Sequence, residues 1–173
     1  DGARVAMAAN DLPNAQLDLT KALTILRSEP RLTGLRESAQ SLLAEVDQKL
    51  IAVADRLASR ERFARFVKLR DEAQFLGTLY TGMELAANLQ ASRAAVHEAL
   101  AVYGVSATYD STLTVDEHLD ESEQTQIRGD CYQLMLILAE TEAQSSLVLD
   151  EQERRSQLDE ALRTLDRAPR YGT

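Results

Sequence analysis

The feature of this sequence that most constrains its fold is a run of 42 residues, between Gly34 and Gly77, that contains neither glycine nor proline. Because these two residues are the usual breakers of regular structure, their absence permits one long element. Apolar residues recur through the first half of the run at steps of three or four: Leu35, Ala39, Leu42, Val46, Leu50, Val53 and Leu57. Steps of this size place side chains on one face of an α-helix. The run therefore predicts a long amphipathic helix.

The apolar spacing changes its phase after Leu57. The next regular series is Phe66, Leu69, Ala73, Leu76 and Tyr80, with Phe63 slightly to one side. On one straight helix this second series would point away from the core that the first series faces. We therefore expect a break or kink near Ala58 to Glu61.

Composition favours helices along the rest of the chain. The 173 residues include only 7 Gly and 3 Pro, 45% of them are apolar, and Ala, Leu, Glu, Gln and Arg are abundant. These are strong helix formers, and no comparable strand pattern occurs. The predicted fold class is all-α, built from antiparallel helical hairpins that are joined by short turns.

We expect a single all-helical region over residues 1–173, in four parts. An N-terminal helical hairpin occupies residues 1–30, and the long helix with the helix after it occupies residues 31–105. An acidic loop follows at residues 106–120, and a C-terminal helical hairpin occupies residues 121–173.

Capping residues mark the expected helix ends. Asp11 can cap the second helix, and Asn88 can cap the helix after the long one. Gly104 suits the left-handed position after a helix C-terminus. Two successive capping boxes, Thr114-x-x-Glu117 and Asp120-x-x-Glu123, precede the helix that contains Cys131. The last helix is expected over about Glu151 to Arg167, and the Cys131 helix is expected to be the most buried.

A three-residue pattern suggests how these hairpins stack. Small, bulky and small residues stand at tetratricopeptide spacing in two helices: Ala15, Leu19 and Ala22, and again Ala161, Leu165 and Ala168. We therefore expect a degenerate tetratricopeptide-like arrangement, an α-α superhelix, without a regular 34-residue repeat.

The residues with catalytic or metal-binding chemistry are few and isolated. His97 and His118 stand in no metal-ligand spacing, and the single cysteine, Cys131, lies in an apolar run that predicts a buried thiol. No nucleophile elbow, phosphate loop, dinucleotide fingerprint or kinase catalytic loop is present. We expect no enzymatic activity, no cofactor and no metal.

No stretch approaches the ~20 apolar residues that span a bilayer, and no signal peptide is recognisable. We expect no membrane span and a cytoplasmic location. The abrupt start at Asp1 and Gly2 suggests a piece of a longer chain.

The sharpest electrostatic feature is a basic run within the long helix. Six positive side chains, opposed only by Glu61, make up this run: Arg56, Arg60, Arg62, Arg65, Lys68 and Arg70. It could contact a polyanion, lie on a solvated helix face, or pair with a complementary acidic segment of the same chain: Asp110, Asp116, Glu117, Asp120, Glu121 and Glu123. Because the net charge is −9, with +1 in residues 1–80 and −10 in residues 81–173, we predict protein contacts within or between chains, and no nucleic acid.

Two segments carry a family resemblance. Residues Phe63 to Phe75 (Phe-Ala-Arg-Phe-Val-Lys-Leu-Arg-Asp-Glu-Ala-Gln-Phe) and Ala87 to Val105 resemble the helical region after the kinase domain in planctomycete-type bacterial serine/threonine protein kinases. In that family a helix like Cys131 to Glu140 follows, and then tetratricopeptide repeats whose opening resembles Leu158 to Ala168. The resemblance covers most of residues 30–168. It implies a non-catalytic sensory or scaffolding region of a kinase-linked signalling protein.

Two functions remain open. The first is a tetratricopeptide-like interaction or scaffolding module that binds a peptide, a protein or another copy of itself through a surface that includes the basic run. The second is a regulatory domain that senses a small ligand between its helices. A polar cavity between the helix after Asn88 and the Cys131 helix would favour ligand sensing, and a closed, packed core would favour the scaffold.

Overall fold

The computed structural model describes residues 2–78, 85–106, 111–145 and 150–172 of the chain. These residues form α-helices and short 3₁₀ helices without a strand, which confirms the all-α class. The α-helices are α1 (Gly2–Ala8), α2 (Leu12–Leu26), α3 (Thr33–Leu76), α4 (Leu85–Ala101), α5 (Glu121–Ser145) and α6 (Glu151–Arg167). Two 3₁₀ helices lie at Pro30–Leu32 and Ala168–Arg170.

The contacts within the chain define two compact units, where the sequence suggested a single region. Unit 1 is Asp1–Ala58 and unit 2 is Ser59–Thr173, so the boundary falls inside α3. The helix is uninterrupted from Ala58 to Glu61, so the expected break there is wrong, and the alternative of a kink stays a prediction. The apolar phase changes at this point for a different reason: the two halves of α3 contribute to two separate hydrophobic cores.

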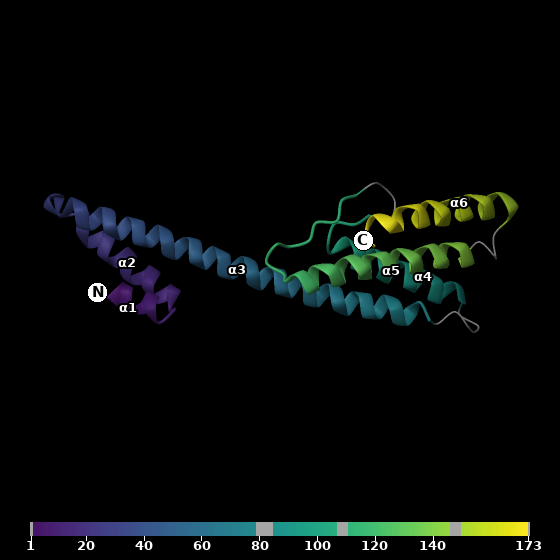
Figure 1. Cartoon of the computed structure of the whole chain (residues 1–173), viewed down its shortest axis with the longest axis horizontal. Helices are drawn as coiled ribbons and strands as arrows, with labels where there is room; N and C mark the ends of the chain where they lie inside the picture. Colours follow the sequence, from purple (N-terminus) through teal and green to yellow (C-terminus); the bar gives the residue numbers. More distant parts are fainter. Residues whose placement is uncertain (1, 79–84, 107–110, 146–149, 173) are drawn as a thin grey trace. The chain divides into compact units, whose positions relative to one another are not determined.

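Unit 1 is a helical hairpin packed on the first half of α3. A tight turn in which Asn10 has a φ of 58° joins α1 to α2. Asp11 then caps α2 as predicted, because its side chain accepts a hydrogen bond from the Asn14 N–H at 3.3 Å. Figure 1 shows α1 and α2 beside this half of α3. The core of the unit consists of four buried apolar residues: Leu12, Ala15, Leu19 and Val46.

Only the middle of the predicted apolar stripe of α3 is covered. Val46 is fully buried and Leu42 and Leu50 are half-buried, but Leu35, Val53 and Leu57 are exposed. For Val53 and Leu57, which lie at the end of the stripe far from the α2–α3 connection, the reason is length. The 15 residues of α2 span about 22 Å, whereas the stripe from Leu35 to Leu57 spans about 33 Å.

Unit 2 contains the second half of α3 together with α4, α5 and α6, which lie alongside one another in Figure 1. Phe66, Leu69 and Ala73 of α3 are buried as the second apolar series predicts, and Tyr80 lies outside the described residues. The rings of Phe66 and Tyr103 meet edge to face, with centroids 5.2 Å apart. Leu134 and Leu138 of α5 are fully buried, in agreement with the expectation for the Cys131 helix.

Local capping chemistry explains most helix ends of unit 2. Gly104 has a φ of +72°, the left-handed conformation predicted for it. The box before α5 is also confirmed, since the Glu123 N–H donates to Asp120 Oδ1 at 2.8 Å and the Asp120 N–H donates to Glu123 Oε2 at 3.0 Å. Thr114 begins no helix, and Asn88 lies inside α4 and does not cap it, so these two predictions are wrong.

The two tetratricopeptide-type triplets behave differently. Ala15 and Leu19 are buried in the core of unit 1, and Ala22 is half-buried. In α6, Ala161 and Ala168 are buried but Leu165 is exposed. Antiparallel hairpins are therefore present at both ends of the chain, and the superhelical stacking of a tetratricopeptide array stays a prediction.

None of the described helices combines the length and the apolar character that a membrane span requires.

Candidate functional site

The clearest concave surface of unit 1 is an apolar groove between α1, α2 and the start of α3. Its volume is about 540 Å³ and it opens to solvent. We call it the unit 1 groove. Small and bulky apolar residues line it, together with a few charged ones: Gly2, Ala3, Arg4, Asp18, Leu19, Lys21, Ala22, Ile25, Leu26, Leu35, Ser38, Ala39 and Leu42.

The unit 1 groove combines hollows with projecting side chains. Ala3, Ala22 and Ala39 line it and leave space, because each has only a methyl group. Two bulky lining residues lie largely in water, Ile25 with 68% of its surface exposed and Leu35 with 61%. Exposed apolar side chains around a hollow are typical of surfaces that bind another molecule.

A close approach of α1 to α2 shapes one wall of the groove. A Cβ atom added to Gly2 would lie 2.6 Å from Oδ2 of Asp18, which is closer than real contacts allow. Glycine therefore leaves room for the Asp18 carboxylate, the end of a flexible side chain, to lie against α1 at this point. Asp18 belongs to the same lining as Arg4 and Lys21, so the groove carries both signs of charge.

Sequence reasoning missed this site. Leu35 was expected to be buried, and Ile25 was not assigned to any surface. A signal was available, because Ile25 and Leu26 are adjacent apolar residues in α2. Neighbouring helix positions point about 100° apart, so Ile25 widens the apolar surface of α2 beyond the stripe that runs through Leu19 and Leu26.

The basic run does not form one free surface, because four of its six side chains meet carboxylates of unit 2. Arg62 Nη1 donates to both carboxylate oxygens of Asp116, at 2.7 and 2.8 Å. Arg60 approaches Glu123 at 4.0 Å. Asp116 and Glu123 belong to the acidic segment that the sequence offered as an intramolecular partner, whereas Asp110 lies outside the described residues.

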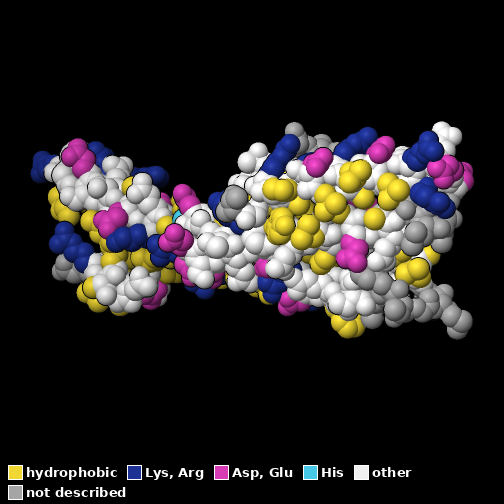
Figure 2. Space-filling view, turned by 45° about the vertical axis from the view of Figure 1, so that its right-hand side comes forward, with side chains coloured by type: hydrophobic (Ala, Val, Ile, Leu, Met, Phe, Trp, Pro, Cys, Tyr) yellow, Lys and Arg dark blue, Asp and Glu magenta, His cyan; other side chains and the backbone are white. Residues whose placement is uncertain are grey.

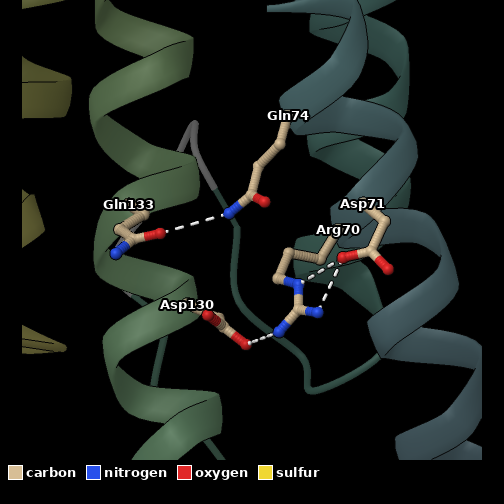
Figure 3. Close-up of polar contacts among 5 residues, drawn as sticks. All are labelled: Arg70, Asp71, Gln74, Asp130 and Gln133. Carbon is tan, nitrogen blue, oxygen red and sulfur yellow. Dashed lines mark hydrogen bonds and ion pairs between the residues drawn. The ribbon is translucent and has the colours of Figure 1, made fainter.

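The other two pairs involve partners outside the predicted acidic segment. Arg65 lies 3.5 Å from Glu98 of α4. Arg70 is mostly buried and bonds to Asp71 of its own helix and to Asp130 of α5 (Figure 3). Burial alone would lower the pKa of Arg70, but the hydrogen bonds with Asp130 and Asp71 raise it above its ordinary value. Arg70 is therefore a charged, structural contact.

Figure 3 shows a second polar contact beside this ion pair. Gln74 Nε2 donates to Gln133 Oε1 at 3.1 Å, one helical turn along α3 from Arg70. The two contacts join α3 to α5 within unit 2. Arg56 and Lys68 are exposed, and neither has an ion-pair partner in the parts of the chain that the structure describes. Of the predicted surface, these two remain open to a partner.

Unit 2 contains a buried polar cluster made of residues from α4, α5 and α6. Thr164 Oγ1 donates to Glu142 Oε2 at 3.0 Å, and both residues are buried. Burial raises the pKa of Glu142, although the Thr164 hydrogen bond and the charge of Arg93 oppose the shift. Two guanidinium nitrogens of Arg93, Nε and Nη2, are buried and have no hydrogen-bond partner among the described residues, and the same holds for the hydroxyl of Ser92.

The isolated reactive residues have ordinary structural environments. Cys131 is fully buried as predicted, and burial raises the pKa of its thiol to about 12, which keeps the nucleophilic thiolate scarce. Burial and nearby Arg93 lower the pKa of His97 in α4, while His118 is exposed. Among the described residues, no cluster of His, Cys, Asp or Glu has a metal-binding arrangement.

Between α4 and α5, where a ligand cavity would favour sensing, apolar side chains of the described residues pack against one another. Val96 and Leu100 of α4 and Cys131, Leu134 and Leu138 of α5 are all fully buried, so no water-sized space adjoins them.

A small polar pocket lies elsewhere in unit 2. Its volume is about 350 Å³ and its lining is Ser111, Thr112, Leu113, Arg128, Arg170 and Tyr171. The Tyr171 hydroxyl donates to the Ser111 carbonyl at 3.2 Å, which joins the C-terminal end of the chain to this segment.

Apolar side chains reach the surface of both units in Figure 2. In unit 2, Leu136 of α5 and Leu158, Leu162 and Leu165 of α6 are exposed.

Comparisons of the chain with models of protein families, with curated proteins and with solved structures find no match.

Proposed function

We propose that this chain is a non-catalytic helical scaffold that binds proteins through the unit 1 groove, with a helix of the partner as the occupant. The observation that carries the proposal is the pairing of hollows at Ala22 and Ala39 with exposed Ile25 and Leu35 in one open groove. An apolar helix face is the occupant that such a groove between helices suits, because its side chains stand at matching spacing.

In this proposal unit 2 has a structural role and catalyses no reaction. Its core is closed between α4 and α5, and most of the basic run serves internal ion pairs. The kinase-linked signalling context and the cytoplasmic location are part of the proposal, and they rest on the sequence alone.

Selection from a displayed library of helical peptides tests the proposal. The full chain is immobilised at low density, so that neighbouring copies stay apart. We expect enriched peptides to carry apolar residues three or four positions apart, and to lose binding on Ile25→Lys and Leu35→Lys. Leu57→Lys is the matched control, because Leu57 is also exposed, at 59%, and lies outside the groove lining. Peptides that bind all variants equally, or no enrichment, would overturn the proposal.

A second candidate function, sensing of a small anion, is favoured by the polar pocket. Two guanidinium groups, from Arg128 and Arg170, and the hydroxyl of Thr112 suit a phosphate or a carboxylate. Inorganic phosphate should then shift the thermal unfolding of the full chain, and Arg128→Ala should remove the shift. Arg163→Ala, which alters an exposed arginine outside this pocket, is the control.

A further inference from the structure

Unit 1 holds more exposed than buried apolar side chains. Its core consists of four residues. Among its described residues, eight large apolar side chains are exposed: Val5, Leu17, Ile25, Leu32, Leu35, Ile51, Val53 and Leu57. A unit of this size buries a smaller fraction of its surface than a larger domain does, so covering part of this apolar surface would stabilise it.

The unit 1 groove offers both halves of an interface. Ile25 and Leu35 project from it, and Ala22 and Ala39 leave the space that such side chains need. A two-fold axis can turn this surface onto itself, so that the projections of each copy enter the hollow of the other. Two-fold homodimers use one self-complementary patch in this way.

The distribution of charge favours the same partner. Residues 1–58 contain 7 Lys and Arg and 8 Asp and Glu, a net charge of −1, whereas residues 59–173 contain 12 and 20, a net charge of −8. Two copies of unit 1 therefore meet almost without repulsion, while two copies of unit 2 repel each other. Asp18, Arg4 and Lys21 also line the groove. A two-fold rotation can place the carboxylate of one copy next to a basic side chain of the other copy.

We propose that the partner helices at the unit 1 groove are α2 and α3 of a second copy of this chain, in a two-fold homodimer centred on Ile25 and Leu35. This inference rests on the proposed function, because it names the partner of the same site.

Sedimentation equilibrium of the full chain, from micromolar to near-millimolar concentration, tests the dimer. Wild type should show a monomer–dimer equilibrium. Ile25→Lys and Leu35→Lys should each weaken it by about 30-fold or more, because two copies of a buried charge enter one interface. Leu57→Lys and Val53→Lys, which change exposed apolar residues of the same unit outside the groove, should leave the dissociation constant nearly unchanged.

Circular dichroism of each variant keeps the test independent of folding. Ile25 and Leu35 are exposed, so a lysine at either position should leave the helix content unchanged. If a lysine variant unfolds, Ile25→Ser and Leu35→Ser supply the milder comparison at the same positions.

The outcomes separate the two proposals. A wild-type chain that stays monomeric throughout, but binds displayed peptides in a groove-dependent way, overturns the dimer and supports the proposed function. A dimer that is unaffected by both groove substitutions shows that another face mediates association, which also overturns this inference. A dimer that only the groove substitutions weaken supports both.

Discussion

At the scale of single residues, the buried carboxyl of Glu142 is the most unusual feature. Its partner is the hydroxyl of Thr164, which donates at 3.0 Å, and burial holds the pKa of Glu142 above the ordinary value of 4.5. A group with a raised pKa in the folded state binds its proton more tightly there than in the unfolded state. Its contribution to stability is full below pH 4.5 and is lost as pH rises through the raised pKa.

Glu142→Gln should therefore change the pH dependence of stability. Glutamine does not ionise, and its carbonyl oxygen still accepts the hydrogen bond from Thr164. We expect the free energy of unfolding of the variant, relative to wild type, to increase between pH 4 and pH 7, because only wild type loses stability through this group as pH rises. Urea unfolding at several pH values measures this difference. A difference that decreases with pH would mean that attraction to Arg93 and Arg167 outweighs burial.

At the scale of elements, capping decides where α5 begins. The sequence contains two successive capping boxes, yet only Asp120 and Glu123 form the reciprocal hydrogen bonds. Thr114 lies before a non-helical segment, and its N–H donates to the Tyr103 carbonyl at 3.3 Å. A capping-box sequence therefore forms its reciprocal hydrogen bonds only where a helix begins directly after it.

Asp120→Ala should destabilise unit 2 by about 0.5–2 kcal/mol, the usual effect of removing a side-chain cap. Thr114→Ala, at the start of the unused box, should change stability by less than about 0.5 kcal/mol. Chemical denaturation of both variants measures the contrast. Equal effects would show that the box contributes nothing to α5.

The ion pairs of α3 link elements that are distant in sequence. Arg62 and Asp116 are separated by 54 residues, and Arg70 and Asp130 by 60. Such pairs direct the basic run toward the carboxylates of its own unit. The same charges are then less available to a polyanion.

We therefore expect no tight binding of random duplex or single-stranded DNA near physiological ionic strength. Fluorescence anisotropy of labelled DNA provides the measurement. The double variant Arg62→Glu and Arg65→Glu should lose stability or partner binding, because both arginines face carboxylates in the folded chain. Strongly salt-dependent DNA binding that this variant abolishes would reassign the basic run to nucleic acid.

At the scale of the whole molecule, the two units differ greatly in how much they bury. Among the described residues, the core cluster of unit 2 contains 17 buried residues and that of unit 1 contains four. Local stability follows buried apolar contacts, so one helix, α3, should combine two levels of stability along its length.

Hydrogen exchange of backbone amides should show this gradient. At low protein concentration, amides of α3 before Ala58 should exchange faster than those around Phe66 to Ala73. The central residues of unit 1 should become slower at high concentration if copies associate through the groove, since binding stabilises the folded state. Uniform protection along α3 would contradict the division into two units.

The sequence by itself determined the all-α class, the bounds of α6, the cap at Asp11, the box at Asp120 and the left-handed Gly104. These features depend on hydrogen bonds and backbone preferences within a few residues, so a local pattern is enough to specify them. Tertiary structure decided which apolar residues are covered. The stripe from Leu35 to Leu57 reads as one buried face, but α2 is too short to cover Val53 and Leu57, and Leu35 is exposed beside Ile25 in an open groove. It also decided that Arg62 meets Asp116 and that two cores share one helix, because burial depends on the length and position of neighbours that are distant in sequence.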